Sequence, residues 1–538
     1  MKSISSTGSF ADFTLKNFIY VDKTEYIYNI LETEERVFIS RPSCFGKSLT
    51  LDTIGTLFEK GVDPYFKGTW IYDKWTEPTY PVFRLNLIEY PQSDLTEFKR
   101  RLIKDISNFA HLNKVENYVE DESPTGSLKS LLASLAMKGR MIVFLIDEYD
   151  CQLTANINDK EVYDSFKEFF SEFYGTIKGK FAIKFLGITG VTRTKNSSDF
   201  SGTDINDITN DSAYSQLIGF TRDEIKKYYI DYLKLAASYE NNCSVDEVAE
   251  PQIESIVDKL EEQYGGYCFD EFYKKKVFNT WSVNRFFQAV KSNKKIHFGD
   301  YWYDNGGVPK ILSDFVKNYE HELFECILNA KFISVTENDF KFPPALTTID
   351  PKVLMCQTGY LTLRSNLKYV KILLGIPNSE LYNALLSIMA FNIFDETKLV
   401  NINEQILAKS ENVAQIISLL NTVMNSVSNE NYPINSETMV QQLVYVYLKG
   451  ICNSVSTELH SSKGNSYLVI ESSIRRIVFE FKYAQNETEA KVKLSEAVEQ
   501  IKSRDYGNIL PKKNELLRIA AVFNADPKVR AFTDYQQA

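Results

Sequence analysis

The chain has 538 residues and a formal net charge of −10, and 44% of its residues are hydrophobic, 13% aromatic and 25% charged. This composition excludes a wholly disordered or collagen-like chain, and the length predicts about three domains. The acidic balance excludes a protein that coats nucleic acid by bulk charge alone, but it leaves room for a local basic face. The seven cysteines form no CxxC pair and the four histidines are scattered, which argues against a zinc site or a disulfide scaffold.

Neither a signal peptide nor a membrane span is predicted. The first residues, MKSISSTGSFADF, lack an apolar core, and no run approaches the roughly 18 apolar residues that a membrane span needs. We therefore expect a soluble, cytoplasmic protein without a membrane partner.

Short apolar runs alternate with longer helical patterns in the first 220 residues. Strands that alternate with helices favour parallel pairing, so the pattern predicts an α/β unit with a parallel sheet. The predicted strands lie within 36–40, 80–87, 141–147 and 181–190, and the clearest helices lie at 95–109 and 128–137.

Two further regions follow, so that the predicted domains are 1–220, 221–366 and 367–538. The middle region is mostly helical, and we expect it to form a lid or linker subdomain. The last region mixes strands with helices. Its predicted helices lie at 378–394, 437–449 and 487–503, and its predicted strands at 368–377, 466–471, 475–482 and 516–523.

The segment SRPSCFGKSLTLDTI at 40–54 is a candidate phosphate loop, because Gly46, Lys47 and Ser48 follow a predicted strand and open a predicted helix. A helix N-terminus offers backbone N–H donors and the positive end of its dipole to a polyphosphate. Lys47 would contact the terminal phosphates, and the Ser48 hydroxyl would join a Mg²⁺ shell. A GKS triplet also occurs by chance, and Arg41 replaces the usual first glycine, but the position between strand and helix favours the phosphate-binding interpretation.

Paired carboxylates end the predicted strand MIVFLID, where Asp147 and Glu148 follow a long apolar run. Two solvated acids at the end of a strand would be the alternative for such a pair alone. Combined with the phosphate loop, the pair favours a magnesium-organising Asp147 and a water-activating Glu148. The neighbouring predicted strand FAIKFLGITG ends in Thr189, a candidate γ-phosphate sensor, and Arg193 is a weaker candidate that fits a plain loop charge equally well.

A second candidate site lies in the predicted strand RRIVFEFKYA. Glu480 and Lys482 are two residues apart and project from the same face, where a buried carboxylate and ammonium need each other, a metal or a phosphate. An exposed strand with an E-x-K sequence is the common alternative. Residues 463–530 carry 13 basic and 9 acidic residues, which fits either a solvated surface or a local contact with DNA or RNA.

These segments together resemble AAA-ATPase-like proteins that carry a C-terminal PD-(D/E)xK nuclease-superfamily domain. The resemblance covers nearly the whole chain. Its marks are YVDKTEYI at 20–27, SRPSCFGKSL at 40–49, FLIDEYD at 144–150, ITGVTR, DINDIT and GFTRDE within 188–224, YGGYCF and FNTWSV within 264–283, TGYLTL at 358–363, GIPNSE at 375–380, FEFKYA at 479–484 and QIKSRDY at 500–506.

The resemblance implies a P-loop NTPase parallel sheet, a helical subdomain and a C-terminal restriction-endonuclease-like α/β domain. It implies ATP and Mg²⁺ as cofactors, with Asp147, Glu148, Glu480 and Lys482 as catalytic residues. The implied metal ligands are Ser48, Asp147 and Glu480, and the implied ATP-binding residues are Asp22, Lys23, Thr24, Arg41, Phe45, Gly46, Lys47, Ser48, Leu49 and Thr189.

The sequence departs from the family pattern at two places. Ser43 and Cys44 stand where two basic residues are usual. Tyr467 stands 13 residues before Glu480, where the nuclease pattern has an aspartate, and a phenol whose pKa is near ~10 stays neutral at pH 7 and binds Mg²⁺ poorly. Glu471 and Glu437 are candidate substitutes for that aspartate.

We therefore expect an ATP-binding and ATP-hydrolysing protein whose nucleotide state is coupled to a nuclease-like domain that engages nucleic acid, in a setting such as defence. One alternative is an ATPase with a degenerate, binding-only or structural nuclease fold. Another is an interaction switch that binds nucleotide but hardly turns it over. The choice between DNA and RNA and the formation of a homo-oligomer are left open.

Overall fold

The computed structural model forms two compact units: one comprises the described residues of 1–312 and 331–381, and the other those of 313–330 and 382–538. None of the described helices is both long enough and apolar enough to cross a membrane. The division into three predicted domains stays a prediction. The structure describes residues 1–5, 7–177, 182–194, 205–302, 326–327, 332–367, 370–394, 409–410, 412–427, 432–450, 456–462, 465–471, 475–504, 506 and 515–538.

A five-stranded parallel sheet organises the first unit, as the sequence predicted. Its strand order is β2-β3-β4-β1-β5, so β4 lies between β1, which precedes the phosphate loop, and β3, which ends in the paired acids. The carboxyl ends of parallel strands share one edge of the sheet, so the residues that follow β1, β3 and β4 are neighbours there. The strands are β1 (Arg36–Ser40), β2 (Val82–Asn86), β3 (Ile142–Asp147), β4 (Ile183–Gly190) and β5 (Asn206–Asp207).

The helices of this α/β part surround the sheet. Two of the predicted ones, at 95–109 and 128–137, form as α4 and α5. The helical elements are α1 (Phe10–Leu15), α2 (Thr24–Thr33), α3 (Lys47–Lys60), η1 (Leu87–Glu89), α4 (Leu95–Leu112), α5 (Pro124–Met137), α6 (Cys151–Ala155) and α7 (Lys160–Ile177).

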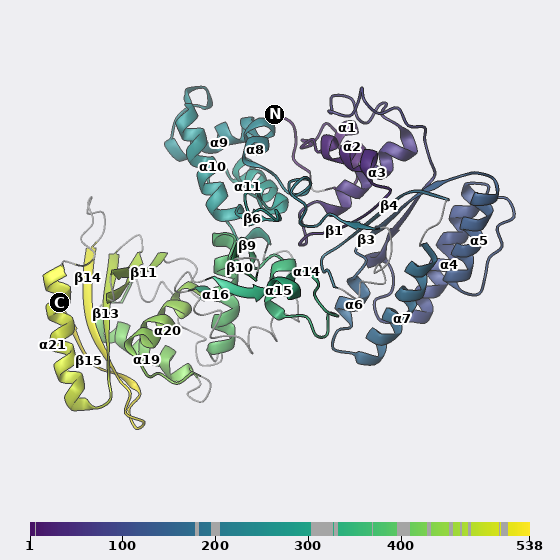
Figure 1. The fold of residues 1–538 in the computed structure, drawn as a ribbon. Helices are drawn as coiled ribbons and strands as arrows, with labels where there is room; N and C mark the ends of the chain where they lie inside the picture. The colour runs from purple at the N-terminus through teal and green to yellow at the C-terminus, as the bar shows by residue number, and fades with distance from the viewer. Residues whose placement is uncertain are drawn as a thin grey trace. The chain divides into compact units, whose positions relative to one another are not determined.

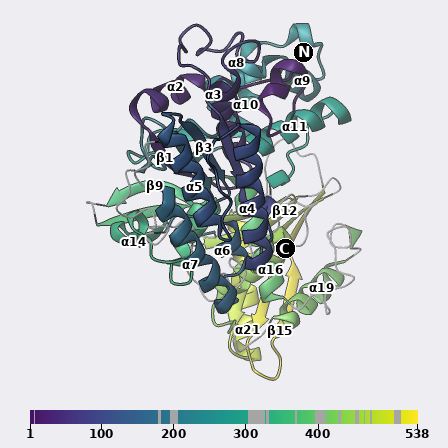
Figure 2. The ribbon, with the colours of Figure 1, turned by 90° about the vertical axis from the view of Figure 1, so that its right-hand side faces the viewer.

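Both faces of the sheet are covered. Phe144 and Ile146 of β3 pack into a core with α4, α5 and α7, the helices nearest the viewer in Figure 2. On the other face α3 comes so close to β4 that a Cβ on Gly187 would lie 3.1 Å from the Leu51 side chain. Successive strand residues point to opposite faces, so burial on both sides explains why β3 reads as a continuous apolar run.

A helical bundle follows, in agreement with the predicted character of the middle region. Its core joins four helices with Ile19 and Val21 from the N-terminal segment. Thr221 and Glu224 form a capping box that starts the first of these helices. The elements are α8 (Arg222–Tyr228), α9 (Ile230–Asn241), η3 (Val245–Glu247), α10 (Glu250–Tyr264), β6 (Tyr267–Cys268), β7 (Lys276–Val277) and α11 (Thr280–Asn293).

A small antiparallel sheet completes the first unit, with strand order β8-β10-β9. The sequence predicted the middle strand β10 and missed the outer strands β8 and β9. The elements are β8 (Ile333–Thr336), α14 (Glu337–Lys341), α15 (Pro351–Gln357), β9 (Thr362–Leu367) and β10 (Lys371–Gly375).

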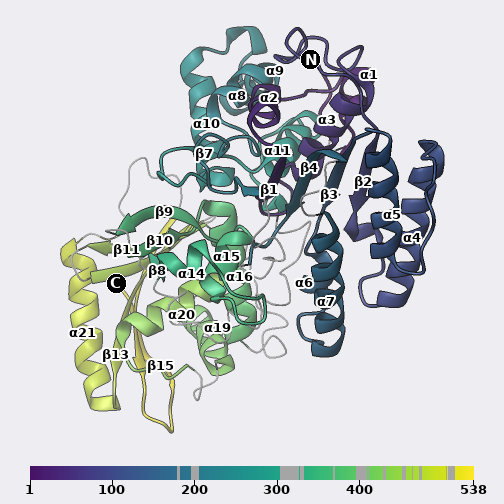
Figure 3. The same cartoon turned by 45° about the vertical axis from the view of Figure 1, so that its right-hand side comes forward.

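A mixed five-stranded sheet forms the centre of the second unit, with strand order β11-β12-β13-β14-β15 (Figures 1 and 3). Strands β13 and β14 are parallel and the other pairs antiparallel, and α21 makes the crossover that a parallel pair requires. The elements are α16 (Ser379–Ile393), which begins in the first unit, α19 (Val413–Ser426), α20 (Glu437–Gly450), β11 (Ser456–Ser462), β12 (Asn465–Glu471), β13 (Arg475–Ala484), α21 (Glu487–Arg504), β14 (Glu515–Asn524) and β15 (Ala531–Gln537).

Candidate nucleotide-binding site and carboxylate–lysine site

The phosphate loop connects β1 to α3. Gly46 immediately precedes the helix in a left-handed conformation, with φ of 109°, and a Cβ added there would meet no atom within 4 Å. Glycine is therefore needed for the backbone conformation and not for space. Phe45, Ser48 and Leu49 line a pocket, and Ser48 is exposed at the first turn of α3.

Lys47 links this loop to the acids of β3. Its side chain is only 3% exposed, and its ammonium group donates to the Pro42 carbonyl oxygen at 3.3 Å. The same group forms an ion pair with Glu148 Oε1 at 3.4 Å. The structure thus brings two residues together that are 101 positions apart in the chain.

The two predicted acids have different environments. Asp147 Oδ1 accepts hydrogen bonds from the Thr189 hydroxyl and, at 3.0 Å, from the Glu148 backbone N–H, so its orientation is fixed. Glu148 has a left-handed φ of 53° and points to Lys47. Burial raises the pKa of Glu148 above its usual range; Lys47 opposes this shift, and the charges of Asp150 and Asp147 add to it.

Asp150 is a residue of this edge that the sequence analysis did not single out. It is 2% exposed, and it accepts from the Thr192 backbone N–H at 2.6 Å, the Val191 N–H at 3.2 Å and the Thr192 hydroxyl. These bonds tie the segment after β3 to the end of β4. Its place in FLIDEYD was the available signal, because an aspartate just beyond a strand end commonly bonds nearby backbone.

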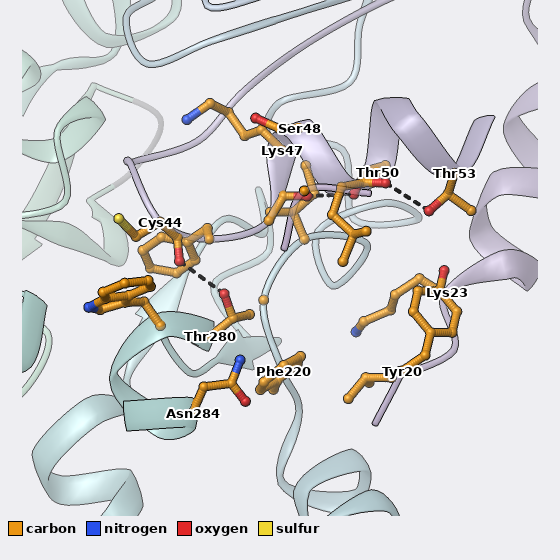
Figure 4. A pocket seen from close by; sticks show the side chains of 18 of the residues that line it. Tyr20, Lys23, Cys44, Lys47, Ser48, Thr50, Thr53, Phe220, Thr280 and Asn284 are labelled. Atoms are coloured by element: carbon orange, nitrogen blue, oxygen red, sulfur yellow. Dashed lines mark hydrogen bonds between the residues drawn. The ribbon is translucent and has the colours of Figure 1, made fainter. Parts of the chain in front are cut away.

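A pocket of about 330 Å³ opens beside the phosphate loop. Figure 4 shows Thr280 and Asn284 of α11 across from Tyr20 and Lys23 of the N-terminal segment. Asn284 Oδ1 accepts from the Tyr229 hydroxyl at 2.6 Å, which orients the amide. Tyr20, Thr280 and Asn284 were not predicted as site residues, because tertiary packing and not a local pattern brings them to the phosphate loop. Among the described residues that line the pocket, the cations are Lys23 and Lys47.

Of the predicted Asp22, Lys23 and Thr24, only Lys23 lines the pocket, and the other two stabilise the local backbone. Asp22 accepts from the Trp70 backbone N–H at 2.7 Å and from the Thr24 hydroxyl, so Asp22 and Thr24 fix the start of α2. Lys23 lines the pocket and donates to Glu224 and to the Gln216 carbonyl, both at 2.7 Å. Burial lowers the pKa of Lys23, against the effect of Glu224.

Two predicted arginine contacts are directed elsewhere. Arg41 is 1% exposed, donates to the Thr209 carbonyl at 2.6 Å and stacks 4.2 Å from the Phe269 ring, and burial lowers its pKa to about 9. Arg193 donates to the Phe340 carbonyl at 2.7 Å and pairs with Asp207 at 3.2 Å. Neither belongs to the residues that line the pocket, so their roles toward ATP stay predictions.

The C-terminal pair forms as the sequence predicted. Glu480 is fully buried, and its Oε1 accepts from the Lys482 ammonium at 2.8 Å, whereas Oε2 has no hydrogen-bond partner among the described residues. Burial raises the pKa of Glu480, and Lys482 opposes the shift. Burial would lower the pKa of Lys482, but its bonds to Glu480 and Glu437 outweigh burial and raise it.

The structure separates the two candidate substitute carboxylates. Glu437, at the start of α20, accepts from Lys482 at 3.1 Å and so lies beside the pair. Glu471 instead pairs with Arg476 across the hairpin. Tyr467 stacks on Tyr506, with ring centroids 4.2 Å apart.

Several basic residues of 463–530 form ion pairs with acidic residues of the same range. Arg475 pairs with Glu515, Arg476 with Glu471, Lys491 with Glu487 and Lys493 with Glu496. Lys512 and Lys513 lie outside the described residues. Lys502, on α21, is exposed.

Comparisons with known proteins match two separate parts of the chain. Residues 5–200 match the family model described as predicted AAA-ATPase, and residues 435–532 match that of the PD-(D/E)XK nuclease superfamily. A curated protein of Azotobacter chroococcum mcd 1, described as an uncharacterized protein in the vnfD 5′ region, is 27% identical over 355 residues. The matched part is 64% of this chain and 61% of that relative, so the chain spans about three fifths of its length.

Solved structures give weaker similarities. A Walker-type ATPase of Pyrococcus abyssi is 13% identical with a TM-score of 0.34, over 68% of this chain and 94% of that one. The ORC2 protein of Aeropyrum pernix, solved as ADPNP and ADP complexes, is 10% identical with a TM-score of 0.29, over 69% of this chain and 92% of that one.

Proposed function

From a chain that combines an AAA-ATPase-like domain with a PD-(D/E)XK nuclease-superfamily domain, we propose an ATP-hydrolysing protein whose nucleotide state is coupled to a nuclease-like domain that engages nucleic acid. One observation carries the ATPase part: Lys47, Asp147, Glu148 and Thr189 converge at one sheet edge beside a pocket of about 330 Å³.

The residues at this edge fit a nucleotide with a magnesium ion. The N-terminus of α3 presents backbone donors to phosphate, and the Ser48 hydroxyl and the Asp147 carboxylate are oxygen ligands of the kind that Mg²⁺ prefers. Bound there, the ion would neutralise phosphate charge. Lys47 would exchange its contact with Glu148 for the terminal phosphates.

Glu148 is suited to activate water. Once Lys47 turns to phosphate, the carboxylate keeps a raised pKa from burial and can accept a proton from an attacking water. The Thr189 hydroxyl donates to Asp147 and fixes its orientation, so Asp147 would bind Mg²⁺ while Glu148 activates water.

ATP binding and turnover of three proteins test this part. Lys47→Ala should abolish ATP binding, whereas Glu148→Gln should bind ATP with nearly unchanged affinity and lose at least ~100-fold in kcat, the usual size of a general-base contribution. Turnover that is unchanged in Lys47→Ala would refute the ATPase assignment.

The C-terminal unit supports metal-dependent cleavage of phosphodiesters. The unpaired Oε2 of Glu480 and the nearby Glu437 are two carboxylates that fit a divalent ion, and Lys482 lies between them. Cleavage of nucleic acid with Mn²⁺, compared among wild type, Glu480→Ala and Lys482→Ala, tests this. Nicking that persists in both variants would exclude this site.

A binding-only nuclease fold is the second candidate function. The observation that favours it is the stacking of Tyr467 on Tyr506, which places an aromatic pair where the nuclease pattern has a carboxylate. Such a protein would bind nucleic acid with a strong salt dependence and without cleavage. A defence role rests on analogy alone, and a homo-oligomer is a further proposal that sedimentation would test.

A further inference from the structure

Two backbone carbonyl groups of the phosphate loop, those of Ser43 and Cys44, accept hydrogen bonds from side chains of other segments. The Trp302 indole N–H donates to the Ser43 carbonyl at 3.1 Å. The Thr280 hydroxyl, in the first turn of α11, donates to the Cys44 carbonyl at 2.9 Å (Figure 4). Ser43 and Cys44 directly precede Phe45 and Gly46, so the two hydrogen bonds fix the part of the loop whose backbone N–H groups would face phosphate.

Both supporting elements are bound by a single carboxylate, that of Glu380. Its Oε1 accepts from the Trp302 backbone N–H at 2.7 Å, and the Ser282 hydroxyl lies 3.1 Å from Oε1 and 2.9 Å from Oε2. Glu380 is fully buried. A buried carboxylate that lost such donors would be costly, so the donors are held strongly in place.

The backbone around Glu380 leaves little freedom. The Asn378 side chain donates to the Gly265 carbonyl at 2.8 Å and accepts from the Leu381 N–H at 3.1 Å. Gly266 has a φ of 79°, and a Cβ there would lie 2.2 Å from the Pro377 carbonyl oxygen. Three segments that the proposed function leaves without a role, YGGYCF, FNTWSV and GIPNSE, thus meet behind the phosphate loop.

We propose that Glu380 is a positioning residue for the phosphate loop, acting through Ser282 with Thr280 and through Trp302. This inference rests on the proposed ATP binding and adds the group that preorganises the loop. Glu380 also lies in the first turn of α16, and the residues of this helix from Tyr382 onward belong to the second unit.

Variants of Ser282 and Glu380 test the proposal. Ser282→Ala and Glu380→Ala should each weaken ATP binding by about tenfold, as expected when a buried hydrogen bond is lost, and raise KM with a much smaller change in kcat. Glu380→Gln should restore binding to near the wild-type level, because its amide can accept from Trp302 and donate to Ser282. Ser238→Ala is the matched control, since Ser238 is a buried serine of α9 that bonds the Leu235 carbonyl, and its affinity should stay at the wild-type level.

Hydrogen exchange without nucleotide separates this inference from the proposed function. The amides of 43–48 should exchange faster in Ser282→Ala than in wild type or Ser238→Ala. Faster exchange in a protein that never binds ATP would refute the ATPase while supporting the positioning role. Wild-type exchange and wild-type ATP affinity in a folded Ser282→Ala protein would overturn the positioning role, and so would a Glu380→Gln protein that behaves like Glu380→Ala.

Discussion

Replacing Thr189 by valine tests the role of the strand between the phosphate loop and the acids. Thr189 is fully buried, and its hydroxyl donates to Asp147 Oδ1, which among the described residues otherwise accepts only the Glu148 N–H. Valine keeps the shape of threonine, so no cavity forms and the loss is that of one hydrogen bond to a charged group. Such a bond is worth about 1.5 to 3 kcal/mol, a factor of roughly 10 to 150 in the folding equilibrium.

Calorimetry provides the measurement, because ATP should raise the Tm of the first unit and so identify its transition. At roughly 2 to 3 °C per kcal/mol, Thr189→Val should lower this Tm by about 3 to 9 °C. Because Asp147 loses its orientation, kcat for ATP should also fall by at least ~10-fold. Thr176→Val is the control, since Thr176 is a buried threonine of α7 whose hydroxyl donates to an uncharged acceptor, the backbone carbonyl of Glu172. A Thr189→Val protein with wild-type Tm and kcat would refute the reasoning.

Three further predictions concern the backbone, the surface and the pH dependence. Gly46→Ala should cost about 1 to 2 kcal/mol through its left-handed φ and weaken ATP binding in calorimetric titration, whereas Gly61→Ala, at φ of 71° beyond the other end of α3, should lose stability without losing affinity. Arg222→Ala removes partners of Glu254, Asp258 and Glu261, and should cost about 1 kcal/mol in urea unfolding at low salt and clearly less at 0.5 M salt; a cost that does not depend on salt would contradict an ionic origin. Because burial raises the pKa of Glu148, the acid limb of the pH profile of kcat/KM should lie above the usual glutamate range. Ionisation of Glu148 should also lower the free energy of unfolding as the pH rises from the pKa of this group in the unfolded chain to its pKa in the folded protein. An acid limb at the ordinary glutamate value would contradict the assignment of Glu148 as the base.

Local patterns were sufficient for β1 to β4 and for the residues at their ends, whereas β5, β8, β9, β11 and β15 were not predicted. The apolar run of β3 predicted a buried strand, and parallel pairing then places Asp147 and Thr189 at one edge whatever the strand order. The order itself, with β4 between β1 and β3, comes from long-range packing that no local pattern encodes.

Long-range side-chain contacts were the part that sequence reasoning could not reach. Arg193 carries a guanidinium group that could bind phosphate, yet it contacts Phe340 and Asp207. The segments that carry these two residues reach Arg193 only through the tertiary packing of the unit. A count of basic residues near Glu480 likewise does not show which of them bind an acidic neighbour, as Arg476 binds Glu471. Glu437 was one of two alternatives, and only tertiary structure distinguishes it from Glu471.

The small sheet β8-β10-β9 has a practical consequence for shortened forms of the protein. A fragment that ends at residue 366 would remove β10, and with it the strand that pairs with both β8 and β9. The backbone groups of those two strands would then be open to pairing with other chains, which is a common origin of aggregation. A fragment that runs through α16 to Ile393 keeps the sheet and the whole helix that carries Glu380, and we therefore expect it to aggregate less than the fragment that ends at residue 366.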